Sequence, residues 1–142
     1  MEPRLNVITL GVRDLQRSIK FYEEGLGWKR SASSQEAVAF FQVGALVLSL
    51  FGWDDLADDA KLPAAGTGFR GISLACNTRS KAETDEVLAL AAKAGGQLIK
   101  PAEEVFWGGY SGYFADPDGH LFEVAYNPFW ELNDKGEVVL PA

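Results

Sequence analysis

One order of structural signals occurs twice in this 142-residue chain: an apolar strand, a helix, a glycine-rich stop and then further strands. Three pairs of residues hold matching places in the two halves: Ile8 and Ile72, Gly27 and Gly96, and Gly44 and Gly119. The separation within these pairs grows from 64 to 69 to 75 residues, which is typical of a degenerate duplication whose second copy has longer loops. Each copy alone would be too small to bury its sheet well, so the two sheets are expected to pack against each other or to curve together. The repeat therefore predicts an α+β fold in which two modules form a curved mixed sheet around a cleft.

The first module is expected to span residues 5–53. Three short apolar runs predict its strands, at residues 5–12, 37–43 and 45–51. Asp14 is a suitable cap for a helix after the first strand. Leu15, Ile19 and Tyr22 then recur at helical spacing and give that helix one apolar face. The pattern indicates a strand, a covering helix and a hairpin.

The second module is expected to span residues 69–128. Its strands are predicted at residues 71–76, 97–100, 112–115 and 120–126. Ser80 and Glu83 have the spacing of a capping box, which begins a helix that should end at Gly95. The sequence DPDG at residues 116–119 predicts a tight turn between the last two strands.

Two segments lie outside the predicted modules. Residues 54–68 are rich in Asp and include Pro63, so we expect a linker, with a solvated loop at residues 54–59. The tail, residues 129–142, is expected to hold a polar loop and one short apolar run.

The composition excludes several classes of site. The chain has one cysteine, Cys76, and one histidine, His120, so it has no disulfide within the chain and no zinc site of the Cys/His type. Cys76 lies in a predicted strand and is expected to be a buried, inert thiol. The net charge of −7 argues against nucleic-acid binding, which needs clustered Lys and Arg. The sequence has neither an apolar run of about 18 residues nor a signal-peptide pattern, so we expect a soluble cytoplasmic protein without a membrane partner.

Two runs of sequence carry a family resemblance. GVRDLQRSIKFYEEGLGW, at residues 11–28, and GGYSGYFADPDGHLFEVAYNP, at residues 108–128, resemble the opening and closing segments of vicinal oxygen chelate proteins. That superfamily includes glyoxalase I, extradiol dioxygenases and bleomycin-resistance proteins. The resemblance implies paired βαβββ modules that surround a small-molecule cleft, often completed in a homodimer.

The same resemblance places four metal ligands on the first and last strands of the two modules. In this sequence the four positions hold Val7, Leu48, Gly71 and Glu123, and the first three have no donor atom in their side chains. A catalytic metal keeps about three protein ligands. We therefore expect no metal and no other cofactor, and His120, in the DPDGH turn, is expected to be a turn residue.

Glu123 is the one ionisable residue at these positions. Strand alternation sends Leu121, Glu123 and Ala125 to one face, which the resemblance assigns to the cleft. A carboxylate there could act as a general base or anchor an amine or hydroxyl of a ligand. The alternative is a structural carboxylate that pairs with an Arg or a backbone N–H, and the sequence leaves both open.

Aromatic side chains near two glycines are the candidate ligand-binding residues. Trp107, Tyr110 and Tyr113 are expected to line the cleft, because Trp and Tyr combine stacking area with one hydrogen-bond donor. Phe51 and Trp53 hold a related place after the last strand of the first module, although ordinary packing is the preferred interpretation for Phe51.

Phe129 and Trp130 lie just beyond these candidates, and the sequence leaves open whether they close the cleft or form dimer surface.

The leading hypothesis is a metal-free protein that binds a small aromatic or amphipathic molecule. The alternative is a lyase, isomerase or dioxygenase of the same superfamily that uses Glu123 as a base or as a residual metal ligand. A third possibility is an interaction module whose cleft has no ligand. The identity of the ligand does not follow from the sequence.

Overall fold

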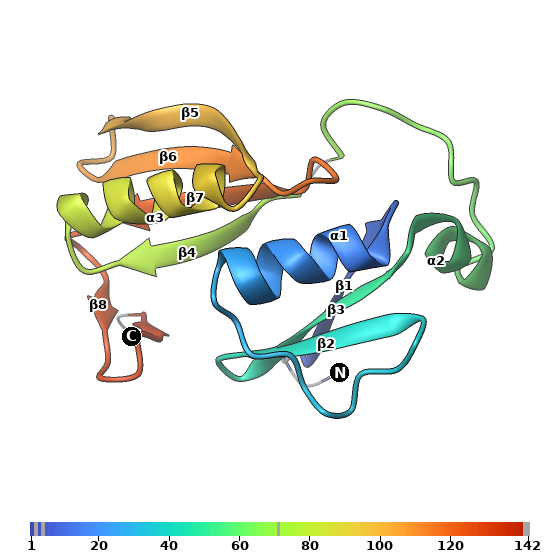
Figure 1. Ribbon diagram of the computed structural model, residues 1–142. Coiled ribbons are helices and arrows are strands. Elements are labelled where there is room, and N and C mark those ends of the chain that lie inside the picture. The colour runs from blue at the N-terminus through green and yellow to red at the C-terminus, as the bar shows by residue number, and fades with distance from the viewer. Residues whose placement is uncertain (2, 4, 71, 141–142) are drawn as a thin grey trace. The chain divides into compact units, whose positions relative to one another are not determined.

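The computed structural model describes residues 1, 3, 5–70 and 72–140 and divides the chain into two compact units. The first comprises residues Met1–Arg70 and the second residues Gly71–Ala142. Both combine strands with helices, which confirms the α+β class (Figure 1). Within the described part of the chain, no helix is both long enough and apolar enough to cross a membrane.

The first unit is a three-stranded sheet with one helical face. Its elements in chain order are β1 (Val7–Val12), α1 (Leu15–Ile19), the π-helical segment η1 (Lys20–Gly25), β2 (Val38–Val43), β3 (Leu46–Gly52) and α2 (Trp53–Asp59). The strand order is β1-β3-β2, with β1 parallel and β2 antiparallel to β3. The predicted cap is confirmed, because Asp14 Oδ1 accepts a hydrogen bond from the backbone N–H of Arg17 at 3.0 Å. Gly44, at φ +62°, makes the predicted hairpin turn.

Large side chains form the core of this unit. Tyr22, 0% exposed, meets Phe21 edge-on with ring centroids 5.0 Å apart and lies 5.3 Å from Trp28. Phe41 of β2 is also fully buried and lies 5.9 Å from Tyr22. The face of the sheet that carries Phe41 and Leu48, which pair across β2 and β3, is therefore the core face.

The first unit is shorter than a full β-α-β-β-β module. Where a further strand would follow the helix, the structure has a single bridge between Arg30 and Phe41. The backbone N–H of Ser31 donates to the carbonyl of Phe40 at 2.8 Å beside this bridge. Residues 31–37 are mostly Ser, Ala and polar side chains, which do not support a longer strand.

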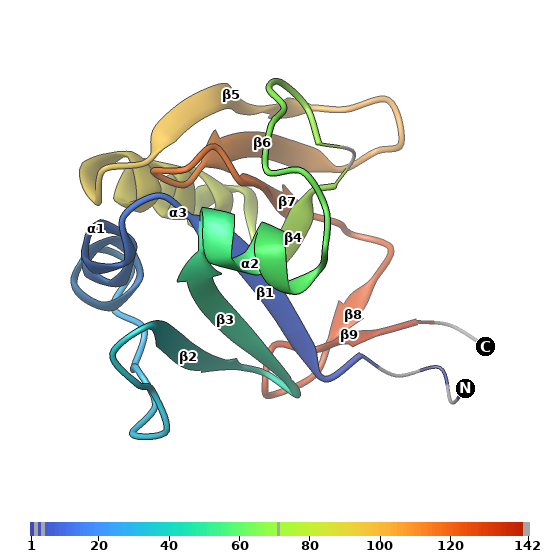
Figure 2. The same ribbon diagram turned by 90° about the vertical axis from the view of Figure 1, so that its right-hand side faces the viewer.

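The second unit has the full module order and a terminal hairpin. Its elements are β4 (Leu74–Thr78), α3 (Lys81–Lys93), β5 (Gln97–Glu104), β6 (Tyr110–Ala115), β7 (Leu121–Tyr126), β8 (Glu131–Leu132) and β9 (Val138–Val139). Its four-stranded sheet has the order β4-β7-β6-β5, and β4 is parallel to β7 just as β1 is to β3. This shared arrangement confirms the duplication. Figures 1 and 2 show α3 along one face of the sheet.

Local signals in the second unit are confirmed by hydrogen bonds. The Ser80 hydroxyl accepts a hydrogen bond from the backbone N–H of Glu83 at 3.1 Å. The Glu83 carboxylate accepts one from the backbone N–H of Arg79 at 2.6 Å. In the DPDG turn, Asp116 Oδ1 accepts from the backbone N–H groups of Asp118 and His120, each at 2.9 Å.

Three expectations about the elements are wrong. The predicted loop at residues 54–59 lies within α2, which begins directly after β3 (Figure 2). β5 continues through Pro101 to Glu104, because it is an edge strand with register shifts, where the missing N–H of proline is tolerated. Cys76 is exposed rather than buried, because β4 is the opposite edge of the same sheet.

Candidate functional site

The second sheet has one face under α3 and one open face, and strand register assigns each side chain to one of them. Gly112 belongs to the helix face, where a Cβ atom would lie 2.7 Å from Leu88 of α3. Glu123 alternates with that face and pairs with Ala75 of β4 and Tyr113 of β6. Glu123 therefore lies in the centre of the open face, as the alternation in its strand predicts.

A pocket of about 510 Å³ opens on this face. Its walls are three aromatic side chains, one carboxylate, two carboxamides and two alanines: Trp107, Phe129, Trp130, Glu123, Asn77, Asn127, Ala75 and Ala125. The floor comes from β4 and β7, and the aromatic side chains come from the connection before β6 and from the segment after β7. The sheet thus supplies Asn77 and Glu123, and the segments outside its strands supply Asn127 and the rings.

Two glycines hold the aromatic side chains of this pocket. The Trp107 ring lies over Gly109, where a Cβ atom would be only 1.8 Å from its Cζ3 atom. At Gly108, with φ +92°, a Cβ atom would lie 2.9 Å from the Phe129 ring. Only glycine allows both rings to approach the backbone this closely. The GG sequence therefore places Trp107 and Phe129 at the pocket.

Tyr113 is the neighbour of Glu123 across the β6–β7 ladder. Burial raises the pKa of the Tyr113 hydroxyl, and the nearby Glu123 carboxylate raises it further. A phenol that stays protonated beside a carboxylate can donate a hydrogen bond to it. The Tyr113 hydroxyl is therefore a hydrogen-bond donor for the Glu123 carboxylate, from the neighbouring strand.

The structure places Tyr110 on the opposite face from Glu123. Its hydroxyl donates to Asp85 Oδ1 of α3 at 2.9 Å, and this hydrogen bond raises the pKa of Tyr110. The ammonium of Lys81 lies 5.8 Å from the Tyr110 ring. Tyr110 therefore packs with the helix, and it does not share a face with the pocket.

The remaining aromatic candidates belong to the first unit. Trp53 is the first residue of α2; its indole N–H donates to the carbonyl of Ala64 at 3.0 Å, and the Arg13 guanidinium lies 4.5 Å from its ring. Phe51 is in β3, paired with Gly11 and Val38. The pocket described above is built without them.

Sequence reasoning missed the two carboxamides and left the tail aromatics undecided. Asn127 continues the two-residue period of Glu123 and Ala125 by one step, so extending that period past the strand end would have found it. Asn77 pairs with Ala125, and this long-range register has no local signal.

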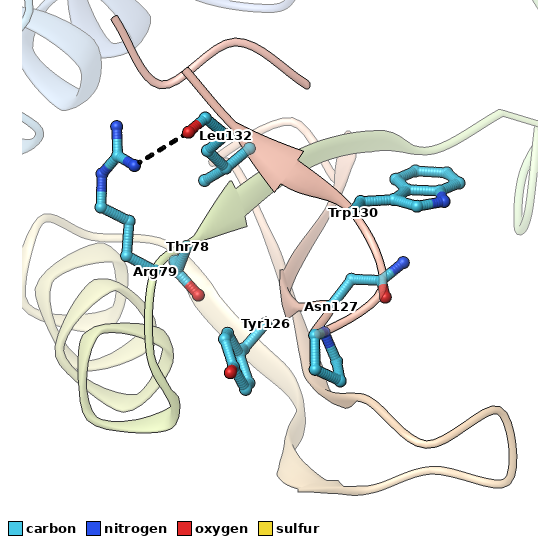
Figure 3. A pocket seen from close by; sticks show the side chains of 7 residues that line it. Thr78, Arg79, Tyr126, Asn127, Trp130 and Leu132 are labelled. Atoms are coloured by element: carbon cyan, nitrogen blue, oxygen red, sulfur yellow. Dashed lines mark hydrogen bonds between the residues drawn. The ribbon is translucent and has the colours of Figure 1, made fainter. Parts of the chain in front are cut away.

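A smaller cavity of about 210 Å³ adjoins the pocket and shares Asn127 and Trp130 with it (Figure 3). The Arg79 guanidinium, at the start of α3, donates to the carbonyl of Leu132 at 3.3 Å and to that of Asn133 at 2.6 Å. These bonds fasten the β8–β9 hairpin to the sheet. Arg79 therefore fixes the segment that carries Trp130.

The positions that the family resemblance gives to metal ligands do not form a donor set. Val7 is 52% exposed, whereas Leu48 is 2% exposed and lies on the core face of the first sheet. Leu48 is the partner of Ile8, so Val7 and Leu48 lie on opposite faces, and the expectation that both point to one ligand site is wrong. Ser49 shares a face with Val7, through its partner Thr9, and a neutral hydroxyl is a weak ligand.

Gly71 lies outside the described residues, and Glu123 is the one remaining donor. No three His, Cys, Asp or Glu residues gather at one place in the described part of the chain. The residues present therefore do not fit a metal held in the manner of the family.

Comparisons with known proteins agree with this fold. The family model described as "Glyoxalase/Bleomycin resistance protein/Dioxygenase superfamily" matches residues 4–124. A glyoxalase-related enzyme from Fulvimarina pelagi is 37% identical, with 99% of each chain covered and a TM-score of 0.87.

Two more distant structures share the fold. A lactoylglutathione lyase from Agrobacterium tumefaciens is 24% identical, with 92% of this chain and 98% of that chain covered and a TM-score of 0.67. A glyoxalase/bleomycin resistance protein/dioxygenase family enzyme from Burkholderia phytofirmans PsJN is 19% identical, with coverage of 85% and 96% and a TM-score of 0.75. A comparison of the sequence with curated proteins finds no match. The chain belongs to the Glyoxalase/Bleomycin resistance protein/Dioxygenase superfamily.

Proposed function

We propose that this protein binds a small aromatic or amphipathic molecule in the open-face pocket of the second unit, without a metal ion. The observation that carries the proposal is the pocket itself, because three aromatic rings and three polar or charged side chains line it together. Its volume of about 510 Å³ falls within the range of small-molecule sites, roughly 300–1,000 Å³.

Each part of the lining has a distinct role in this proposal. Trp107 and Trp130 offer flat apolar area on which a ring can stack. Asn77 and Asn127 provide amide donors and acceptors that orient the ligand. Glu123, supported by Tyr113, accepts a hydrogen bond from an amine or hydroxyl of the ligand.

The test is a ligand-detected NMR screen of flat aromatic fragments, followed by titration of the hits against variants. Trp107→Ala should weaken the hits by about fivefold, because the lost stacking is of the order of 1 kcal/mol. The matched control is Phe106→Ala, since Phe106 is the adjacent residue and is fully exposed (101%). Hits that bind equally to both variants and to the unchanged protein would contradict the proposal.

An enzyme of the same superfamily is the second candidate. The Glu123 carboxylate in the pocket favours it, because a carboxylate can accept a proton from a substrate, and Tyr113 is its neighbour across the β6–β7 ladder. The similarity to a glyoxalase-related enzyme supports it as well. The assays are turnover of the methylglyoxal–glutathione adduct and of a catechol by the protein and by Glu123→Gln. Turnover that requires Glu123 would establish the enzyme, and binding without turnover would favour the binding protein.

A further inference from the structure

We infer that the ligand of the open-face pocket is an organic cation, an aromatic or amphipathic amine whose charged nitrogen lies against Glu123. This inference rests on the proposed function and deepens it, because it names the charge of the ligand. Two features of the pocket lining support it: the negative charge of Glu123 and the faces of three aromatic rings.

The charge of the pocket has one sign. Glu123 is the only ionisable side chain among the described residues that line it. Lys100 shares the open face through its partner Tyr113, but its ammonium is ion-paired with Glu103 at 3.0 Å. Arg79, in the adjoining cavity, donates to the carbonyls of the terminal hairpin. An anionic ligand would thus face Glu123 without a free countercharge.

The wider charge distribution acts in the same direction. Residues 71–142 contain eleven Asp and Glu against five Lys and Arg, which gives this half −6 of the total −7. A field of this sign raises the local concentration of cations and lowers that of anions.

The three rings of the pocket add a second, independent attraction for a cation. The faces of Trp, and less strongly of Phe, carry partial negative charge and attract alkylammonium groups within about 6 Å. Trp107 is held over Gly109, Phe129 is held against Gly108, and Trp130 lines the same pocket. A carboxylate among several aromatic faces is the arrangement with which proteins recognise organic ammonium ions.

The experiment uses three probes that differ only in the end group of one side chain. Tryptamine, tryptophol and indole-3-propionate present an ammonium, a hydroxyl and a carboxylate on the same indolylethyl frame. Isothermal titration calorimetry of the full chain at pH 7.5 and low ionic strength should give about tenfold tighter binding for tryptamine than for tryptophol. Indole-3-propionate should bind most weakly.

Glu123→Gln tests the source of this preference. It keeps the size and an acceptor, so tryptamine should weaken to the level of tryptophol while tryptophol is unchanged. The control is Glu86→Gln, which removes one exposed negative charge from α3 and should leave the preference intact. An equal loss in the control would overturn the inference, because the preference would then come from the general acidic field.

The outcomes separate this inference from the proposed function. If tryptophol or indole-3-propionate binds as tightly as tryptamine, and Trp107→Ala weakens all three, the pocket is a site for aromatic molecules and the organic-cation inference is wrong. If none of the three binds at millimolar concentration, the organic-cation inference is contradicted, and the proposed function is contradicted as well only if the fragment screen gives no hit that Trp107→Ala weakens.

Discussion

At the residue scale, strand alternation decides which side chains meet a ligand. Tyr110 and Tyr113 are three positions apart in β6, so they lie on opposite faces, one against α3 and one beside Glu123. Both rings follow the same glycine pair in the sequence, and composition gives them equal weight as candidates. Only the register of the sheet separates a packing tyrosine from one that adjoins the pocket.

The raised pKa of Tyr113 predicts a pH dependence. Its proton is held more tightly in the folded protein than in the unfolded chain, so this contribution to stability is complete below the usual tyrosine pKa of about 10. The contribution is lost as the pH rises through the higher folded value. Tyr113→Phe should therefore lose less unfolding free energy than the unchanged protein between pH 8 and pH 11, measured by urea denaturation. Equal losses in the two proteins would show that the phenol is not perturbed.

The close approach of Trp107 to Gly109 predicts a specific incompatibility. In Gly109→Ala the added methyl group must push the indole away, since their atoms would be 1.8 Å apart. We expect a loss of about 1–3 kcal/mol in unfolding free energy, the usual cost of overpacking, and weaker ligand binding. The control is the double variant with Trp107→Ala, in which the alanine at 109 should cost little. An equal cost with and without the indole would contradict this placement of Trp107.

At the element scale, the terminal hairpin is part of the site although it lies beyond the repeated modules. The β8–β9 hairpin closes on itself, with the Asn133 side chain accepting from the backbone N–H groups of Lys135 and Glu137 at 2.9 and 3.0 Å. Arg79 attaches it to the start of α3 (Figure 3). One side chain of the module thus positions an element that the duplication does not contain.

Removal of this attachment should loosen the hairpin without unfolding the sheet. In Arg79→Ala we expect faster amide hydrogen exchange at residues 131–139 and weaker ligand binding, because Trp130 is no longer held. The two hydrogen bonds are exposed, so the loss of stability should be small, about 1 kcal/mol. Lys93→Ala removes another exposed cation, from the end of α3, and serves as the control. Unchanged exchange in Arg79→Ala would contradict the role of Arg79.

At the scale of the whole molecule, the family fold persists without the family's ligand set. Both sheets keep a first strand parallel to the last, and the family model spans both of these pairings. The ligand positions are separate from the pairing, since apolar residues at positions 7 and 48 are compatible with it. A fold of this kind can therefore exchange its chemistry while it keeps its topology.

This separation predicts the metal content of the protein. Elemental analysis of freshly purified protein should find no Ni, Zn, Fe or Mn in stoichiometric amount, because the described residues offer no group of three donors. Treatment with a chelator should leave ligand affinity and thermal stability unchanged. A stoichiometric metal that disappears in Glu123→Ala would contradict the prediction.

The homodimer implied by the family resemblance is a further prediction for the whole molecule. Light scattering coupled to size-exclusion chromatography should give twice the 15.4 kDa mass of one chain. A monomer of full ligand affinity would contradict it and would show that the pocket needs no second copy.

The sequence by itself determined the features that depend on neighbours a few residues apart. These are the duplicated order of elements, the caps at Asp14 and Ser80, the turns at Gly44 and Asp116, and the open-face position of Glu123. Each follows from the pattern of a single strand, helix end or turn. The tertiary structure alone decided the partners of Glu123, the placing of Asn77 and Trp130 in its pocket, and the burial of Leu48 on the core face. These depend on strand register and on contacts such as that between Arg79 and Leu132, 53 residues apart, which no local pattern encodes.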